Sequence, residues 1–309
     1  MDGRVLAQRV NLLRPWLRGR FGGEVVKIGL DAGLGCPHRA GGTGAGGCAF
    51  CPPHGSGRGQ GGEPIAEQLA RGLARLAGHR RPAKALAYFQ AYTSTWAPVS
   101  HLAALYRQAL AVDGVAGLVI ATRPDCIDEA VWELLAGLQQ RAPLWLELGL
   151  QSAHDRTLRA IGRGHDVACF DAAVSRARQA GIKVVAHVIL GLPGEEPRHT
   201  EATADHLARL GVWGVKLHNL MILQGAPLAR RHAAGEMVCW SRETYALAAA
   251  RFLARLPRST LVHRLAADPG PDRLLAPDWA ADKDGVLAAL AAAMVQHDLE
   301  QGSLCQISH

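Results

Sequence analysis

Six strand-like segments alternate with helix-like segments along most of the chain, and this alternation is the feature that most constrains the fold. The strand-like segments are short apolar runs, predicted at 24–30, 85–91, 116–122, 143–150, 182–190 and 212–219. Segments with helical periodicity lie between or after them, at 64–77, 99–111, 128–140, 166–180 and 197–210. Because right-handed crossovers make such strands parallel, the pattern predicts an α/β fold, a partial (β/α)6 TIM-type barrel.

A single barrel domain can have a length of 309 residues. The sequence divides into three regions. Residues 1–22 carry arginines among apolar residues and predict a basic amphipathic N-terminal helix. Residues 23–219 are predicted to form the barrel, with a glycine-rich cysteine loop at 31–62. Residues 220–309 predict a C-terminal helical and loop extension that covers the barrel, with helices at 242–256 and 284–299.

Polar side chains fall at alternate positions of the predicted strands, where they would face the inside of the barrel. They are Lys27, Gln90, Tyr92, Glu147, Gln151, His187, Lys216 and His218. An ordinary barrel fills its interior with branched apolar side chains, and buried charges are costly unless they are paired or bind a ligand. The pattern therefore predicts a wide polar lumen that holds a large polar cofactor and a substrate. The alternative is that some of these residues pair with one another.

Three cysteines in the glycine-rich loop, Cys36, Cys48 and Cys51, have the spacing C-x11-C-x2-C. Three thiolates can hold three corners of a [4Fe–4S] cube and leave the fourth iron free to bind a small molecule. Spacing alone leaves two alternatives. One is a zinc site of Cys3His type with His54 or His38 as the fourth ligand. The other is a C-x-x-C redox pair that does not involve Cys36.

The aromatic Phe50 favours the cluster, because Gly-Gly-Cys-Ala-Phe-Cys at 46–51 resembles the end of the radical S-adenosylmethionine (SAM) signature. Further segments resemble motifs of the YtqA/YhcC radical SAM family, which is akin to the barrel of the Elongator catalytic subunit. They lie at 88–95, 122–126, 147–152, 162–166, 191–195, 263–265 and 276–279. The resemblance covers nearly the whole chain from residue 24. Gly35 and His38 stand where the family pattern has Thr and Asn.

The resemblance implies roles for the residues of the cysteine loop, and the strand positions supply further candidates. Cys36, Cys48 and Cys51 would bind a [4Fe–4S] cluster whose free iron chelates the amino and carboxylate groups of SAM, with Phe50 near the adenine. Glu147 and Gln151 would contact the ribose or methionyl part of SAM, and Ile189 and Gly191 would adjoin the adenine. Gln90, Tyr92 and Arg123 are further candidate cofactor contacts. Lys216, His218 and His187 are candidate catalytic residues, for substrate contact or proton transfer.

The implied activity is reductive cleavage of SAM to a 5′-deoxyadenosyl radical that abstracts hydrogen from a substrate. The family resemblance implies a tRNA wobble-uridine side chain as the substrate, changed from carboxymethylaminomethyl to aminomethyl. One alternative is a radical SAM enzyme with a small-molecule substrate. Another is a zinc-stabilised RNA-binding protein without catalysis.

The charge of the chain agrees with a polyanionic partner. The formal net charge is +7 and the pI is about 9.3, which suits tRNA. An electron donor such as flavodoxin or ferredoxin is expected as a second partner, and the oligomeric state is left open. No long uncharged apolar run or leader-like segment is present, so neither a membrane span nor export is expected. The seven cysteines do not form a disulfide pattern, and an exposed cluster needs a reducing compartment, so we expect a cytoplasmic protein.

Overall fold

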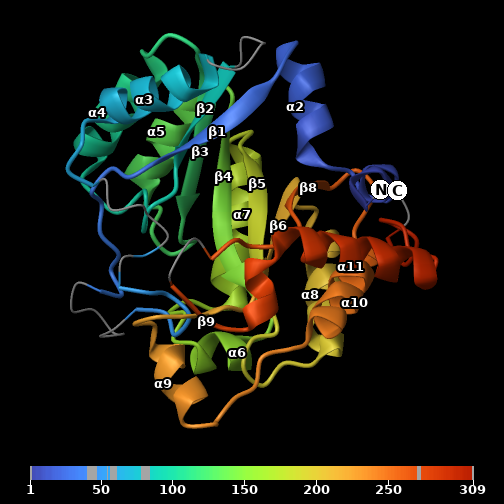
Figure 1. The fold of residues 1–309 in the computed structure, drawn as a ribbon. Helices are drawn as coiled ribbons and strands as arrows, with labels where there is room; N and C mark the ends of the chain where they lie inside the picture. Colours follow the sequence, from blue (N-terminus) through green and yellow to red (C-terminus); the bar gives the residue numbers. More distant parts are fainter. Residues whose placement is uncertain are drawn as a thin grey trace.

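Seven parallel strands form one curled sheet in the computed structural model, which describes residues 2–39, 47–53, 55, 61–77, 84–269 and 273–307 (Figure 1). The strands are β1 (Val25–Leu30), β2 (Lys84–Phe89), β3 (Val115–Thr122), β4 (Leu144–Gln151), β5 (Lys183–Leu190), β6 (Gly214–Asn219) and β8 (Leu261–Arg264). They are ordered β1-β2-β3-β4-β5-β6-β8. This confirms the predicted partial barrel and all six predicted strands.

The seventh strand, β8, was not predicted. It is a four-residue segment of the region 220–309, and it pairs in parallel with β6. Because it is so short, its composition gives no distinct strand signal. The C-terminal region therefore contributes to the barrel wall itself.

Helices cover the outer face of the sheet (Figure 1). Those that connect the strands are α3 (Ile65–Ala77), α4 (Val99–Leu110), α5 (Glu129–Gln139), α6 (Asp155–Ala160), α7 (Val167–Gln179), α8 (Pro197–Leu210), α9 (Pro227–Ala233) and α10 (Arg242–Arg255). Side-chain caps fix several starts: Asp128 accepts a hydrogen bond from the backbone of Val131, and Asp166 accepts one from Cys169. Outward-facing Leu, Val and Ala of the strands pack against these helices to form the large core.

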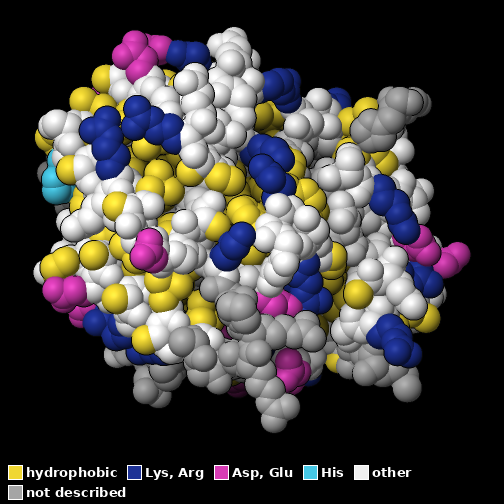
Figure 2. Space-filling view, turned by 90° about the horizontal axis from the view of Figure 1, so that it is seen from above, with side chains coloured by type: hydrophobic (Ala, Val, Ile, Leu, Met, Phe, Trp, Pro, Cys, Tyr) yellow, Lys and Arg dark blue, Asp and Glu magenta, His cyan; other side chains and the backbone are white. Residues whose placement is uncertain are grey.

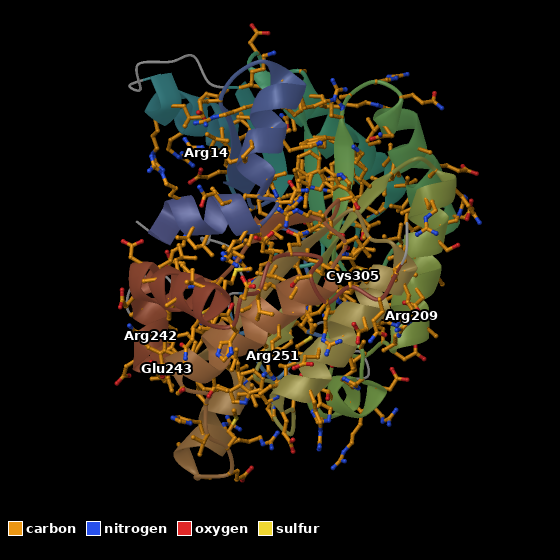
Figure 3. All side chains as sticks on the ribbon, turned by 90° about the vertical axis from the view of Figure 1, so that its right-hand side faces the viewer. Arg14, Arg209, Arg242, Glu243, Arg251 and Cys305 are labelled. Atoms are coloured by element: carbon orange, nitrogen blue, oxygen red, sulfur yellow. The ribbon has the colours of Figure 1, made fainter. Side chains whose placement is uncertain are left out.

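The remainder of the C-terminal region lies against this barrel. It contains β7 (Ile222–Leu223) paired antiparallel with β9 (Leu274–Ala276), the short helix η1 (Asp278–Ala281) and α11 (Lys283–Gln296). Helix α10 packs between α8 and α11. Arg251 projects from α10 in Figure 3, where α10 and α11 lie side by side. Arg251 and Arg255 form ion pairs with Glu201 of α8.

The N-terminal region forms two helices rather than the single one predicted, α1 (Asp2–Arg9) and α2 (Leu13–Phe21). The break comes where Asn11 and Leu12 join the edge of β8, with the backbone N–H of Val262 donating to the Asn11 carbonyl at 2.8 Å. Helix α1 packs on α11, and α2 contacts β1 and β8 at the open side of the barrel. Pairing with a distant strand thus outweighed helix propensity.

The lumen is layered along the strands. At the amino ends, Trp145 and Leu86 pack with Leu13 and Leu17 of α2 into a separate apolar cluster. The next layer is polar and contains Lys27, Glu147 and Lys216. The predicted polar lumen is therefore found only above an apolar floor. None of the described helices is long and apolar enough to span a bilayer.

Candidate active site

Two of the three loop cysteines lie on one tight turn. The backbone N–H of Cys51 donates to the carbonyl of Cys48 at 2.9 Å, and Cys48 is buried while Cys36 and Cys51 are half-buried. Burial raises the pKa of the Cys51 thiol, and the charges of Cys48 and Cys36 raise it further. The three thiols are therefore close enough to interact electrostatically.

Three arginines surround these thiols. Arg163 Nη1 lies 3.5 Å and Arg123 Nη1 4.0 Å from the Sγ of Cys48, and Arg39 Nη2 lies 3.1 Å from the Sγ of Cys51. Guanidinium groups at this range favour thiolates, which are the form that binds metal. Three thiols beside three permanent cations are a donor set that fits an anionic iron–sulfur cluster.

Arg123 and Arg163 are held in place from behind. Arg123 forms a two-bond pair with Asp125, at 2.9 and 2.7 Å. Arg163 donates through Nε and Nη2 to the carbonyl of Gly149, at 3.2 and 2.7 Å. Both are almost fully buried. The cysteine loop is thus tied to the strand ends by side chains with fixed positions.

His38 does not lie as a zinc ligand would. Its Nε2 is 3.1 Å from Arg123 Nη2, so it is in position to accept that hydrogen bond. Burial and the nearby Arg123 lower the pKa of His38, which favours this neutral acceptor form. The other proposed zinc ligand, His54, lies outside the described residues. Within the described ranges, no three His, Cys, Asp or Glu side chains converge to hold one ion. A cube binds its thiolates at separate corners and needs no such convergence.

The predicted contacts at the carboxyl ends of the strands cluster near the loop. Phe50 and Ile189 belong to one apolar cluster there. Gly191 has φ +86°, and a β-carbon at this position would lie 3.2 Å from the Trp240 ring, so the indole lies directly over the Gly191 backbone. Trp240 precedes α10, so the C-terminal region covers this end of the barrel. Sequence analysis did not identify Trp240, since nothing in the local pattern marks it.

Two of the predicted cofactor contacts have unusual backbone conformations. Tyr92 has φ 56° and Gln151 has φ 75°, both in the left-handed region that glycine favours. The Gln151 amide folds over Gly149, where a β-carbon would come within 2.5 Å of its Nε2. The Tyr92 ring lies 5.8 Å from the Arg39 guanidinium. Such strain persists where surrounding structure requires it and is concentrated at functional sites. Gln90 is also at this end. Its side-chain oxygen lies over Gly29 of β1, where a β-carbon would come within 3.2 Å of it.

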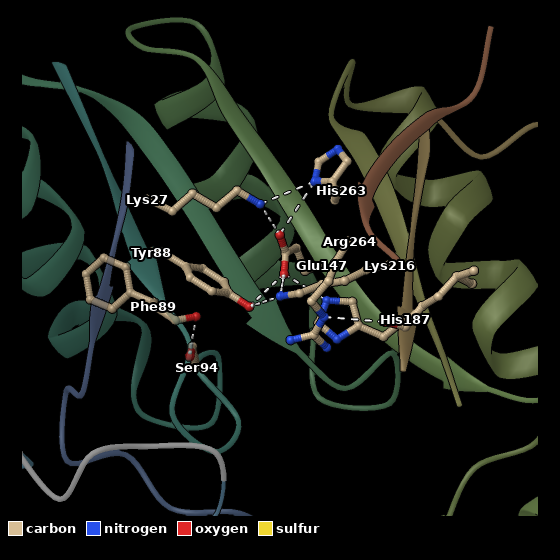
Figure 4. A network of polar contacts seen from close by, with 10 residues as sticks. Lys27, Tyr88, Phe89, Ser94, Glu147, His187, Lys216, His263 and Arg264 are labelled. Atoms are coloured by element: carbon tan, nitrogen blue, oxygen red, sulfur yellow. Dashed lines mark hydrogen bonds and ion pairs between the residues drawn. The ribbon is translucent and has the colours of Figure 1, made fainter. Parts of the chain in front are cut away.

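Glu147 lies one layer deeper, in the network shown in Figure 4. One carboxylate oxygen accepts from Lys27 Nζ at 2.5 Å. The other accepts from the Tyr88 hydroxyl at 2.7 Å, from Lys216 Nζ at 2.8 Å and from His187 Nε2 at 2.8 Å. The Glu147 side chain has no exposed surface. Both oxygens therefore have protein partners, Lys27 on one side and Tyr88, Lys216 and His187 on the other.

Burial and charge set the ionisation of this network. Burial alone would raise the pKa of Glu147, but Lys216 and Lys27 hold it well below its usual value. Burial lowers the pKa of His187 to about 3 and of Lys216 to about 7. Burial also lowers the pKa of His218, whose ring lies 6.0 Å from that of His187. Glu147 is thus ionised, the histidines are neutral, and Lys216 can exchange a proton near neutral pH.

The predicted residues therefore form two groups. Those at the carboxyl ends surround the thiols, and Glu147, His187, Lys216 and His218 form a polar layer beneath them. Tyr88, Arg163 and His263 complete these groups but were not among the predicted site residues. All three could have been found, because each lies in a segment that resembles a family motif.

Comparisons with known proteins agree with this architecture. The radical SAM superfamily model matches residues 33–207, and the radical SAM C-terminal domain model matches residues 212–296. The chain belongs to the radical SAM superfamily. It is 39% identical to protein YhcC of Escherichia coli over 301 residues, covering 97% of this chain and 96% of YhcC. It is 37% identical to protein YtqA of Bacillus subtilis over 301 residues, covering 97% and 94%. This places it in the YhcC/YtqA family.

The solved structure of the archaeal Methanocaldococcus infernus Elp3 has the same fold. Its TM-score is 0.68 at 14% sequence identity, over 90% of this chain and 64% of that chain. Membership of the superfamily makes the protein a radical SAM enzyme with a [4Fe–4S] cluster and SAM as cofactors. The zinc-stabilised RNA-binding alternative is therefore set aside.

Proposed function

We propose that this YhcC/YtqA-family enzyme modifies the side chain of a wobble uridine in tRNA, changing carboxymethylaminomethyl to aminomethyl. The observation that carries the proposal is near-full-length similarity to YhcC and YtqA, whose family the sequence motifs first indicated. The basic charge of +7 supports a nucleic-acid substrate. A small-molecule substrate is the alternative.

We assign the cluster to Cys36, Cys48 and Cys51, and SAM to the strand ends beside them. When bound, the cluster and SAM supply a 5′-deoxyadenosyl radical. Arg39, Arg123 and Arg163 balance the negative charge of the thiolates. Gln90, Tyr92, Arg123 and Gln151 orient SAM from the strand ends, while Phe50, Ile189 and Gly191 border its adenine.

The polar layer of Glu147, His187, Lys216 and His218 contacts the substrate. Glu147 holds Lys216 in place through its ion pair, and Lys216 can donate or accept a proton at Nζ because its pKa lies close to neutrality. His187 and His218 stay neutral and offer hydrogen bonds without adding charge. The apolar floor around Trp145 excludes water from below.

Basic side chains that could contact phosphates are dispersed over the face shown in Figure 2. Figure 2 shows Lys and Arg scattered among hydrophobic and other side chains on the face viewed there, without one continuous basic patch. We therefore propose that several separate arginines contribute to tRNA binding, so that affinity falls steeply with salt. We also propose a flavodoxin or ferredoxin as electron donor, and the cytoplasm as the compartment.

The test uses anaerobically reconstituted enzyme, SAM, a reductant and tRNA that carries the carboxymethylaminomethyl nucleoside. We expect 5′-deoxyadenosine together with aminomethyl nucleoside, measured by mass spectrometry of digested tRNA. A variant with Cys36, Cys48 and Cys51 all changed to Ala should form neither product. Cys305→Ala, outside the loop, serves as the matched control. SAM cleavage with unchanged tRNA nucleosides would contradict the tRNA proposal.

A further inference from the structure

An irregularity in β8 turns an arginine toward the lumen. Val262 pairs with Val215, but the next pair along is Arg264 with Lys216, so His263 is an extra residue on the β8 side. Such a bulge re-aims a side chain that regular alternation would direct outward. His263 Nδ1 lies 3.2 Å from Lys27 Nζ, and Arg264 lies beside Glu147 and Lys216 in Figure 4.

The positive charge around Glu147 exceeds the negative charge. Lys27 and Lys216 form ion pairs with Glu147, and Arg264 lies beside them as a third basic group. Lys27 and Arg264 already outnumber this one carboxylate when Lys216 has lost its proton. Another acid whose charge reaches Arg264 is Asp268, but it is exposed, where solvent weakens its effect. Burial lowers the pKa of His187 to about 3 and of His263 to about 4, so these rings are neutral and do not change the charge balance. A buried excess of cations is costly without an anionic partner.

Arg264 also has hydrogen-bonding capacity left over. Its Nε donates to the carbonyl of Leu217 at 3.4 Å, but its buried Nη2 has no hydrogen-bond partner among the described residues. Most buried guanidinium nitrogens are paired, so an unpaired one needs an explanation. A ligand with an anionic oxygen would provide such a partner.

A cavity gives access to this position. It has a volume of about 490 Å³ and lies where the sheet is open between β1 and β8, with Lys27, His263 and Arg264 in its lining. Leu17 of α2 and Leu287 of α11 contribute apolar walls. Lys283 adds positive charge, while Arg14 forms an ion pair with Glu24, which also lines the cavity. The cavity therefore reaches Lys27, His263 and Arg264, while Glu147 and the Nη2 of Arg264 lie buried behind it.

We propose that Arg264, with Lys216 and Lys27, forms a subsite for an anionic oxygen group of the substrate, a carboxylate or a phosphate. The planar guanidinium matches the two oxygens of a carboxylate. The subsite stands on the charge and contacts of these residues. Only its assignment to the carboxylate of a wobble-uridine side chain rests on the proposed function.

The first test needs no substrate. The melting temperature of the cluster-loaded enzyme is measured in sodium acetate, sodium phosphate and sodium chloride at equal ionic strength. We expect acetate to raise the melting temperature of wild type by about 2 °C or more over chloride, and to have no such effect on Arg264→Gln. Arg258→Gln, which removes an exposed arginine paired with Glu300, should respond as wild type does.

Each other outcome has a defined meaning. Equal melting temperatures of wild type in the three salts would overturn the subsite, and so would an acetate effect that persists in Arg264→Gln. An effect of phosphate without one of acetate would support the anion subsite and assign it to a phosphate. If Arg264→Gln does not fold, Arg264→Lys takes its place. It keeps the charge but not the planar fork, and it should show a smaller acetate effect than wild type; an undiminished effect would overturn the role of Arg264.

The second test links the subsite to the substrate. Binding of 5-carboxymethylaminomethyluridine and of its methyl ester is compared by calorimetry in the presence of SAM. We expect the acid to bind wild type at least about 10-fold more tightly than the ester, and the two to bind Arg264→Gln alike. Preferential binding of the acid without its turnover in tRNA would contradict the proposed function and leave the subsite standing. If the tRNA is turned over but acid and ester bind equally, the substrate carboxylate is not the ligand of the Arg264 subsite.

Discussion

The two ends of the lumen are built from the same strands but by different chemistry. At the amino ends, Trp145 packs 5.4 Å from Trp213, and Trp213 lies 5.0 Å from Trp16 of α2 (ring centroids). At the carboxyl ends, buried Arg123 and Arg163 contact Cys48. Along β4 alone the inward side chains change from Trp145 through Glu147 to Gln151. One end excludes water through apolar contacts, and the other gathers charge around the thiols.

This difference separates stability from function along one axis. In barrels of this type the carboxyl ends carry the reactive groups, while the amino ends contribute to stability. The layer of Glu147 lies between them and belongs to both, since the Glu147 carboxylate is fully paired while Lys216 beside it has a pKa near neutrality. Changes at the top should therefore abolish activity with little loss of folding, and changes at the floor should do the opposite.

The largest expected effect is at the top. Cys48→Ala should lose nearly all of the cluster iron and sulfide, and all SAM cleavage, because a thiolate between two arginines is removed. Cys305→Ala should retain both. Iron and sulfide assays after anaerobic reconstitution measure the outcome. A fully loaded, active Cys48→Ala protein would show that this thiol is not a ligand.

The floor should respond in the opposite way. Trp145 is almost fully buried, so Trp145→Ala should lower the free energy of unfolding by about 3–5 kcal/mol. The protein that remains folded should still bind a full cluster. Val238→Ala, at a position that is 86% exposed, should change the stability by about 0.5 kcal/mol or less. Urea unfolding monitored by circular dichroism gives both values. If folded Trp145→Ala protein contained less iron than wild type, the two ends would not be independent.

The middle layer should link stability to pH. Glu147→Gln leaves Lys27 and Lys216 without their carboxylate, and we expect a loss of about 3 kcal/mol at pH 7. In wild type the folded pKa of Glu147 lies below the unfolded value of about 4.3, so the unfolded state binds more protons between them. Its contribution is therefore full above that value and is lost as the pH falls through the folded pKa.

Urea unfolding between pH 3 and 7 tests this linkage. The difference in free energy of unfolding between wild type and Glu147→Gln should become smaller as the pH falls toward 3. Glu300→Gln, at an exposed ion pair, should show about 0.5 kcal/mol or less throughout. A constant difference across the range would mean that folding leaves the pKa of Glu147 at its unfolded value.

The smallest expected effect concerns backbone strain. Gln151 has φ 75°, so Gln151→Gly should relieve strain and raise the stability by up to about 1 kcal/mol. The same change should weaken SAM binding several-fold, because the amide is lost. Asp298→Gly, at φ 47° and far from the thiols, is the matched control for strain alone. Unchanged SAM affinity in Gln151→Gly would remove this residue from the cofactor site.

The alternation of strands and helices and the cysteine loop could be predicted from the sequence, because each is a local pattern. Apolar periodicity over 144–151 specifies both the strand and the inward face that carries Glu147 and Gln151. The hydrogen-bond partners of these residues could not be predicted from the sequence. Lys27, Lys216 and His187 come from three other strands, and their convergence on one carboxylate depends on how the sheet curls.

By itself the sequence determined the barrel, the thiol ligands expected in its loop, and the family. The tertiary structure alone decided that Glu147 is closed off by protein partners, that α2 seals the amino end, and that a bulge turns Arg264 inward. The physical reason is the range of the forces involved. Helix and strand periodicity is a property of neighbouring residues, whereas register, bulges and charge pairing are fixed by contacts between segments distant along the chain.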